Sequence, residues 1–97
     1  MVIIAWNRIS AFCKQHPKAS EPLLRLYLIA FKADWSSTHE LVSDFGFVDS
    51  IGNDRFVFNI KGNDYRLVAM INFNRRTVYI RFIGSHQEYD QIDCSTI

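Results

Sequence analysis

Residues 55–83 read RFVFNIKGNDYRLVAMINFNRRTVYIRFI, and this stretch decides the fold. Apolar and polar residues alternate in three runs, which span 55–60, 64–73 and 76–83. Alternation at this period is typical of β-strands, and the turn residues between the runs, Gly62 among them, favour tight hairpins. The sequence therefore predicts three antiparallel strands joined by two hairpins.

The two faces of these strands differ in character. Period two places one set of side chains on a common apolar face: Phe56, Phe58, Ile60, Tyr65, Leu67, Ala69, Ile71, Val78, Ile80 and Phe82. The opposite face carries Val57, Asn59, Arg66, Val68, Met70, Asn72, Tyr79 and Arg81. We expect the first face to be packed beneath helices, and the second, mixed face to be half exposed and to bind something.

The flanking residues predict one more strand and several helices. A short strand is expected at 2–5, a helix capped by Asn7 and stopped by Pro17, and a longer helix that starts at Ser20. Capping boxes at residues 37–40 and 85–88 predict a third helix that ends at Gly46 and a last helical turn at 87–91. The expected fold is a single α+β domain over residues 1–97, with an N-terminal strand and helices packed on an antiparallel sheet of hairpin-linked strands.

Composition narrows the class of protein. With 48% hydrophobic, 14% aromatic and 22% charged residues, the 97-residue chain can form a folded core. No segment resembles a signal peptide or a membrane span, so we expect a cytoplasmic protein that does not contact membranes. Cys13 and Cys94 lack the spacing of metal ligands, so no metal, cofactor or disulfide is expected.

The charge is unevenly distributed along the chain. Residues 1–54 carry five basic and six acidic groups, residues 55–83 six basic and one acidic, and residues 84–97 three acidic. The formal net charge of +1 therefore hides a basic sheet. Arginines interleaved with Tyr65, Tyr79 and Tyr89 are typical of proteins that bind single-stranded RNA. Cations on strands also protect sheet edges from aggregation, and Arg75 and Arg76 at a hairpin tip fit that second interpretation.

The strings FNIKGNDYRL at 58–67 and YIRFIGSHQEYD at 79–90 closely resemble the HigB family of bacterial toxins, a branch of the RelE-like ribonucleases. The resemblance extends over most of the chain. It implies a RelE-like fold and a toxin that cleaves messenger RNA, commonly on the ribosome. It also implies silencing by a helix-turn-helix, DNA-binding antitoxin of the HigA type, so that the toxin meets DNA only indirectly.

Metal-free RNA cleavage needs groups that stabilise charge on the phosphoryl oxygens and groups that move protons. Arg66 and Arg81 lie on the same face of adjacent predicted strands and are the candidates for charge stabilisation. His86 follows the last strand and is the candidate general acid or base, because histidine titrates near neutral pH. Tyr89, three residues further on, is expected to stack on a base or share the proton transfer.

Five further residues are candidate RNA contacts: Lys61, Asn63, Arg76, Tyr79 and Glu88. Each candidate has a structural alternative. Glu88 is a base only if its pKa is raised, and otherwise completes the capping box with Ser85. Asn63 is also typical of a turn, and Tyr79 and Tyr89 are also explained by packing. His86 is also explained as an ordinary surface residue after a helix cap.

Three hypotheses about function remain. The first is an endoribonuclease toxin that acts through Arg66, Arg81 and His86. The second is a module that holds RNA or protein on the same basic sheet without cutting. The third, a purely structural interaction domain, leaves five arginines within 29 residues without a role.

Overall fold

The computed structural model describes residues 1–4, 6–46, 48–62, 64–94 and 96–97. In chain order the elements are β1 (Val2–Ile4), α1 (Trp6–Gln15), a 3₁₀ turn (Pro17–Ala19), α2 (Ser20–Lys32), α3 (Thr38–Asp44), β2 (Val48–Gly52), β3 (Arg55–Ile60), β4 (Tyr65–Asn72), β5 (Thr77–Ser85) and α4 (His86–Tyr89). The strands form a five-stranded sheet in the order β1-β5-β4-β3-β2. β1 is parallel to β5, and the other neighbours are antiparallel. The predicted α+β architecture is confirmed.

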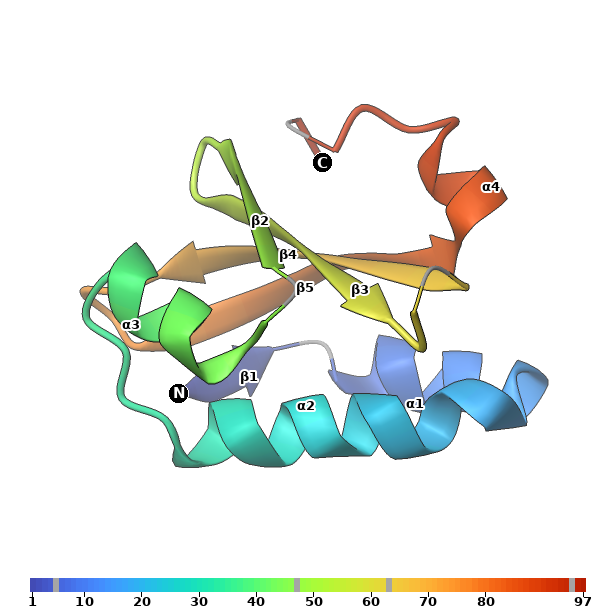
Figure 1. Ribbon diagram of the computed structural model, residues 1–97, viewed down its shortest axis with the longest axis horizontal. Helices are drawn as coiled ribbons and strands as arrows, with labels where there is room; N and C mark the ends of the chain where they lie inside the picture. Colours follow the sequence, from blue (N-terminus) through green and yellow to red (C-terminus); the bar gives the residue numbers. More distant parts are fainter. Residues whose placement is uncertain (5, 47, 63, 95) are drawn as a thin grey trace.

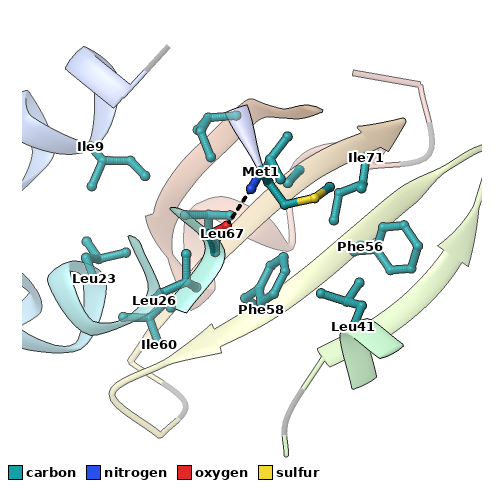
Figure 2. Packing of buried hydrophobic residues seen from close by; sticks show 14 of the residues in the cluster. Met1, Ile9, Leu23, Leu26, Leu41, Phe56, Phe58, Ile60, Leu67 and Ile71 are labelled. Carbon is teal, nitrogen blue, oxygen red and sulfur yellow. Dashed lines mark hydrogen bonds between the residues drawn. The ribbon is translucent and has the colours of Figure 1, made fainter. Parts of the chain in front are cut away.

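The hydrophobic core lies between the helices and one face of the sheet. α1 and α2 lie next to each other across this face (Figure 1). α4 follows the C-terminal end of β5. Ile9 of α1, Leu23 of α2 and Leu41 of α3 have no exposed surface, and they share the core with Leu67 and Ile71 of β4. Figure 2 shows these side chains converging on the centre of the sheet. Burial of each large apolar side chain contributes about 1.5–3 kcal/mol to the stability that fixes the sheet beneath the helices.

The opposite face of the sheet, called here the outer face, carries side chains from the four strands β2 to β5. By register it contains Asp49, Val57, Asn59, Arg66, Val68, Met70 and Tyr79. Val57 and Val68 are only 3% and 0% exposed although they lie outside the core cluster beneath the helices. The chain after α4 passes back over this face (Figure 1), and Arg55 holds the carbonyl oxygen of Ile97 through Nε and Nη2 at 3.1 and 2.7 Å.

Helix ends differ slightly from the prediction. Asn7 lies inside α1, which starts at Trp6, and Ser20 is the first residue of α2, whose cap residue is Ala19. At α3 the hydroxyl of Ser37 accepts from the backbone of Glu40 as expected. The Glu40 carboxylate, however, accepts from the hydroxyl of Ser36, so the predicted reciprocal box at this helix is only half formed. The end of α1 before Pro17 is confirmed.

Strand β2 is the one described strand that the sequence did not predict. Its residues VDSIG alternate poorly, and it pairs with β3 through Val48, Asp49 and Ser50 before a register shift near Gly52. The turn that follows places Gly52, Asn53 and Asp54 at positive φ. Such a short, irregular edge strand has little periodic signal, because pairing with β3 rather than its own sequence stabilises it.

A β-bulge in β5 changes which side chains face the core. Ala69 pairs with Ile80 and Val68 with Phe82, so Arg81 is the extra residue on β5. Beyond the bulge the alternation is shifted by one. Ile83 packs against the core, and Phe82 lies opposite Val68 on the outer face. The prediction that Phe82 shares the core face with Ile80 is therefore wrong.

Candidate functional site

The chain turns from β5 into α4 through a complete capping box. The hydroxyl of Ser85 accepts from the backbone of Glu88 at 3.2 Å, and the Glu88 carboxylate accepts from the backbone of Ser85 at 2.9 Å. These hydrogen bonds, the one from the Ser85 backbone first, lower the pKa of Glu88 below its usual value of 4.5. The condition for Glu88 to act as a base, a raised pKa, is therefore not met. Its carboxylate stays ionised and orients the helical turn that carries His86.

His86 is the first residue of α4 and lies at the end of the outer face. Its backbone N–H donates to the carbonyl oxygen of Asp64 at 3.2 Å, which ties α4 to the start of β4. The imidazole Nδ1 is 3.0 Å from Oδ2 of Asp90, and the side chain is 48% exposed. The carboxylate therefore orients the ring through Nδ1, while half of the side chain remains accessible to a substrate.

Arg66 and Tyr89 meet on the outer face. The guanidinium carbon of Arg66 lies 5.9 Å from the centroid of the Tyr89 ring, a cation–π distance. The phenol oxygen of Tyr89 is 3.3 Å from Sγ of Cys94. This hydrogen bond, together with burial, raises the pKa of Tyr89 to about 12. The raised pKa makes this hydroxyl a weaker acid than an ordinary tyrosine, and its hydrogen bond to Cys94 leaves the ring for stacking, so the stacking role is favoured over proton transfer.

Arg81 occupies the bulge of β5. Its guanidinium carbon lies 5.7 Å from the centroid of Tyr79, and the side chain is exposed. In the part of the chain that the structure describes, Arg81 forms no ion pair. Its carbonyl oxygen accepts from Nη1 of Arg8 in α1 at 3.1 Å. The bulge thus presents a cation at the edge of the outer face, with an aromatic ring beneath it.

Arg66 and Arg81 are not direct neighbours. Arg66 pairs with Gly84, three positions beyond Arg81 on β5. That offset corresponds to about 10 Å along the strand, which two long arginine side chains are able to span around one phosphate. The predicted common face is therefore found, and the bulge sets the spacing between the two cations.

Phe82 and Gly84 are site residues that the sequence reasoning missed. A Cβ atom on Gly84 would lie 2.7 Å from Cζ of Phe82 and 3.2 Å from Oε1 of Glu88. The Phe82 ring therefore covers the place of the missing side chain, next to Arg66 on the paired strand. The glycine in the GSHQEY string is the signal that was available, because close approach of another group is a common reason for a glycine in a strand.

The hairpin candidates lie in different surroundings. Lys61, at positive φ in the β3–β4 hairpin, is 3.3 Å from the Asp64 carboxylate and remains exposed. Arg76 is in the β4–β5 hairpin at the far end of β5 from His86, where Nε is 2.7 Å from Oδ1 of Asp34 and Nη1 donates to the carbonyl of Phe73. The structure therefore does not bring Arg76 to the other candidates. Asn63 lies outside the described residues.

The described residues contain no cluster of three or more histidine, cysteine, aspartate or glutamate side chains that could hold a metal ion. Across the same residues, none of the helices has the length and apolar character needed to cross a membrane. What the α4 end of the outer face does offer is two guanidinium groups, an imidazole and several aromatic rings. That set suits a phosphate-bearing ligand with stacked bases.

Comparison with known proteins agrees with this chemistry. Residues 19–92 match the HigB toxin family, described as the RelE-like toxic component of a toxin–antitoxin system. An mRNA interferase HigB from Escherichia coli O6:H1 is 28% identical over 94 residues, which cover 95% of this chain and 91% of that protein. The mRNA interferase toxin HigB of Escherichia coli K12 and an mRNA interferase HigB of Shigella flexneri are each 28% identical over 92 residues, or 93% of this chain and 88% of theirs.

The family match covers well over half of the chain and includes every described candidate residue of the site. Membership of a toxin–antitoxin system also implies an antitoxin as partner. The protein with this basic, aromatic outer face therefore belongs to the HigB family of RelE-like toxins.

Proposed function

We propose that this toxin is a metal-independent endoribonuclease that cleaves messenger RNA, on the translating ribosome, at the α4 end of the outer face. One observation carries the proposal: Arg66, Arg81 and His86, one each from β4, β5 and α4, lie on the α4 half of the outer face, where Arg66 pairs with Gly84, between Arg81 and His86 on the chain. The names of the relatives, which call them mRNA interferases, support the same substrate.

The chemistry assigned to these residues is transfer of the phosphoryl group within the RNA. The 2′-oxygen attacks the adjacent phosphorus, the bond to the 5′-oxygen breaks, and a 2′,3′-cyclic phosphate forms. A base removes the proton of the 2′-hydroxyl, and an acid returns a proton to the departing 5′-oxygen. Arg66 and Arg81 stabilise the added negative charge on the phosphoryl oxygens, a contribution that preorganised cations make without reorganisation.

His86 is the proposed general acid or base of this reaction. Its Nδ1 is engaged with Asp90, which leaves Nε2 as the nitrogen free to meet the substrate. Tyr89 and Tyr79 each lie beneath a site arginine and are proposed to stack on bases. Lys61 and Asn63 at the β3–β4 hairpin, and Glu88 beside the site, are proposed as secondary RNA contacts. Arg76, far from this cluster, is proposed to be at most a peripheral one.

The partners follow from this proposal. An antitoxin of the helix-turn-helix HigA type is expected to hold the toxin inactive, with acidic side chains that complement the basic face. Toxin action on messenger RNA and ribosomes places the protein in the cytoplasm.

Primer-extension mapping of a defined messenger RNA tests the function. Purified toxin is incubated with the RNA, with and without translating ribosomes, beside a His86→Ala variant. The proposal predicts cleavage that requires ribosomes and is strongly reduced in the variant. Cleavage of free RNA would keep the nuclease and remove the ribosome from the mechanism. No cleavage by folded wild-type protein in either setting would indicate a binding module.

A further inference from the structure

A hollow of about 370 Å³ lies between α1 and the bulged part of β5. The described residues of β1 pair with residues 77–79 of β5, so the edge of β5 beyond Tyr79 faces α1 instead of β1. Arg8, Phe12 and Gln15 line it from α1, and Arg81 and Phe82 line it from β5. The hollow therefore opens directly beside the cation that we assign to the scissile phosphate.

The lining combines cations, aromatic rings and a neutral amide. Among the described residues that line it, Arg8 and Arg81 are the charged ones, and none is a carboxylate. A second hollow of the same volume, at the hairpin end of the sheet, is lined by Asp54, two asparagines and a serine, and its described lining residues include no cation. Volume alone therefore does not distinguish the two hollows. The charge of the first hollow favours an anionic ligand, and its aromatic rings favour one with a flat apolar part.

We propose that this hollow is a nucleotide subsite, which holds the nucleotide next to the cleaved phosphate. Phe82 offers its ring to the base, the amide of Gln15 reads the base edge, and Arg8 contacts the flanking phosphate. Arg8 already reaches across the hollow to the Arg81 carbonyl, so it also supports the bulge that aims Arg81. The inference rests on the proposed function, because it takes RNA to be the ligand of the adjacent site.

Affinity for an uncleavable RNA tests the subsite without relying on catalysis. The probe is a fluorescein-labelled heptanucleotide of mixed sequence with 2′-O-methyl groups throughout. We expect Gln15→Ala and Phe82→Leu each to weaken binding about five- to tenfold, because an amide contact or a stacked ring is lost. Phe82→Leu keeps most of the side-chain volume, and Gln15 is exposed, so both variants are expected to fold.

The salt dependence of binding separates the subsite from general charge attraction. The matched control is Lys14→Ala, an exposed cation on α1 that does not line the hollow. Gln15→Ala and Phe82→Leu should lower affinity by the same factor at every salt concentration, since neither residue is charged. Arg8→Gln should reduce the slope of log affinity against log salt by about one, as loss of a phosphate contact does. Lys14→Ala should change affinity less than twofold at 0.2 M salt.

Cleavage by the wild type, measured in parallel, separates the two proposals. If the wild type cleaves RNA and both Gln15→Ala and Phe82→Leu keep the wild-type affinity for RNA, the subsite is contradicted and the proposed catalysis is not. Unchanged RNA affinity with weakened binding of the antitoxin would overturn it in favour of a protein-docking surface. Affinity that depends on the hollow, in a wild type that cuts no RNA, would support the subsite and contradict the proposed catalysis.

Discussion

Two arginines, one just before β5 and one in the middle of it, lie in contrasting surroundings. At the hairpin end, Arg76 is held by the Asp34 carboxylate and the Phe73 carbonyl. At the bulge in the middle of β5, Arg81 rests over Tyr79 and has no ion-pair partner among the residues that the structure describes. A charge count along the sequence treats these residues alike. A cation that is already paired with a carboxylate is less available to a phosphate than one that is not. The partner of each cation therefore indicates better than the number of cations where a phosphate is able to bind.

Replacing each arginine in turn tests whether the two differ in function. Arg81→Ala should lower the single-turnover rate of RNA cleavage by about 100- to 1000-fold, because one preorganised charge-stabilising group is lost. Arg76→Ala is the matched control and should keep the rate within about twofold, since it lies at the far end of a nine-residue strand. Equal losses in the two variants would show that the basic sheet acts only through its overall charge.

Gly84→Ala should disturb the α4 end with the next largest effect. The new methyl group would meet the Phe82 ring at 2.7 Å and the Glu88 carboxylate at 3.2 Å. We expect a loss of about 1–3 kcal/mol in the free energy of unfolding, measured with urea, and a fall in cleavage of about tenfold. Gly46→Ala is the control, because a Cβ there has no heavy atom within 4 Å. A Gly84→Ala protein with normal cleavage would mean that the position of Phe82 does not matter to the site.

The role of Tyr89 is resolved by comparing two substitutions. Its pKa of about 12, raised by Cys94 and by burial, makes the hydroxyl a weaker proton donor than an ordinary tyrosine. Tyr89→Phe retains the ring over Arg66 and should keep cleavage within about threefold. Tyr89→Ala removes the stacking surface and should lower cleavage about tenfold. If Tyr89→Phe were as inactive as Tyr89→Ala, the hydroxyl itself would take part in the chemistry.

The smallest expected effect concerns the cap of α4. Because the pKa of Glu88 is lower in the folded protein than its ordinary value of 4.5, its carboxylate adds stability above that value. This stability is lost as the pH falls through the folded pKa. Urea unfolding should therefore show the wild type more stable than Glu88→Gln at pH 7, with the gap narrowing as the pH falls below 4.5. A gap that stays constant with pH would assign the effect to the shape of the side chain and not to its charge.

The sequence predicted most of the fold because its signals are local. Alternation located the three hairpin-linked strands, and the serine and glutamate of the second capping box located α4. Strand β2 was missed because pairing with β3 stabilises it more than its own pattern does. The bulge at Arg81 was missed for a related reason, since an inserted residue is defined by the register of two strands.

The same reasoning explains what was predicted of the site. Arg66, Arg81, His86 and Tyr89 were singled out by residue type and by the family string, and the structure places all four on the α4 half of the outer face. Their catalytic roles stay predictions. Phe82 was wrongly assigned to the core because the alternation in the sequence does not show the bulge that turns its side chain to the outer face. Arg8 was overlooked because its contact with Arg81 joins residues 73 positions apart. Contacts over such a distance leave no local pattern.

The most direct test of the central claim, that RNA binds at the α4 end of the sheet, is photochemical crosslinking. A messenger RNA that contains 4-thiouridine, with 2′-deoxy groups at the mapped cleavage positions, is bound to the toxin and irradiated, and the crosslinked peptides are identified by mass spectrometry. Our account predicts crosslinks within residues 79–89 and on the side of α1 that faces β5. Crosslinks concentrated in the hairpin at residues 73–77 would contradict it.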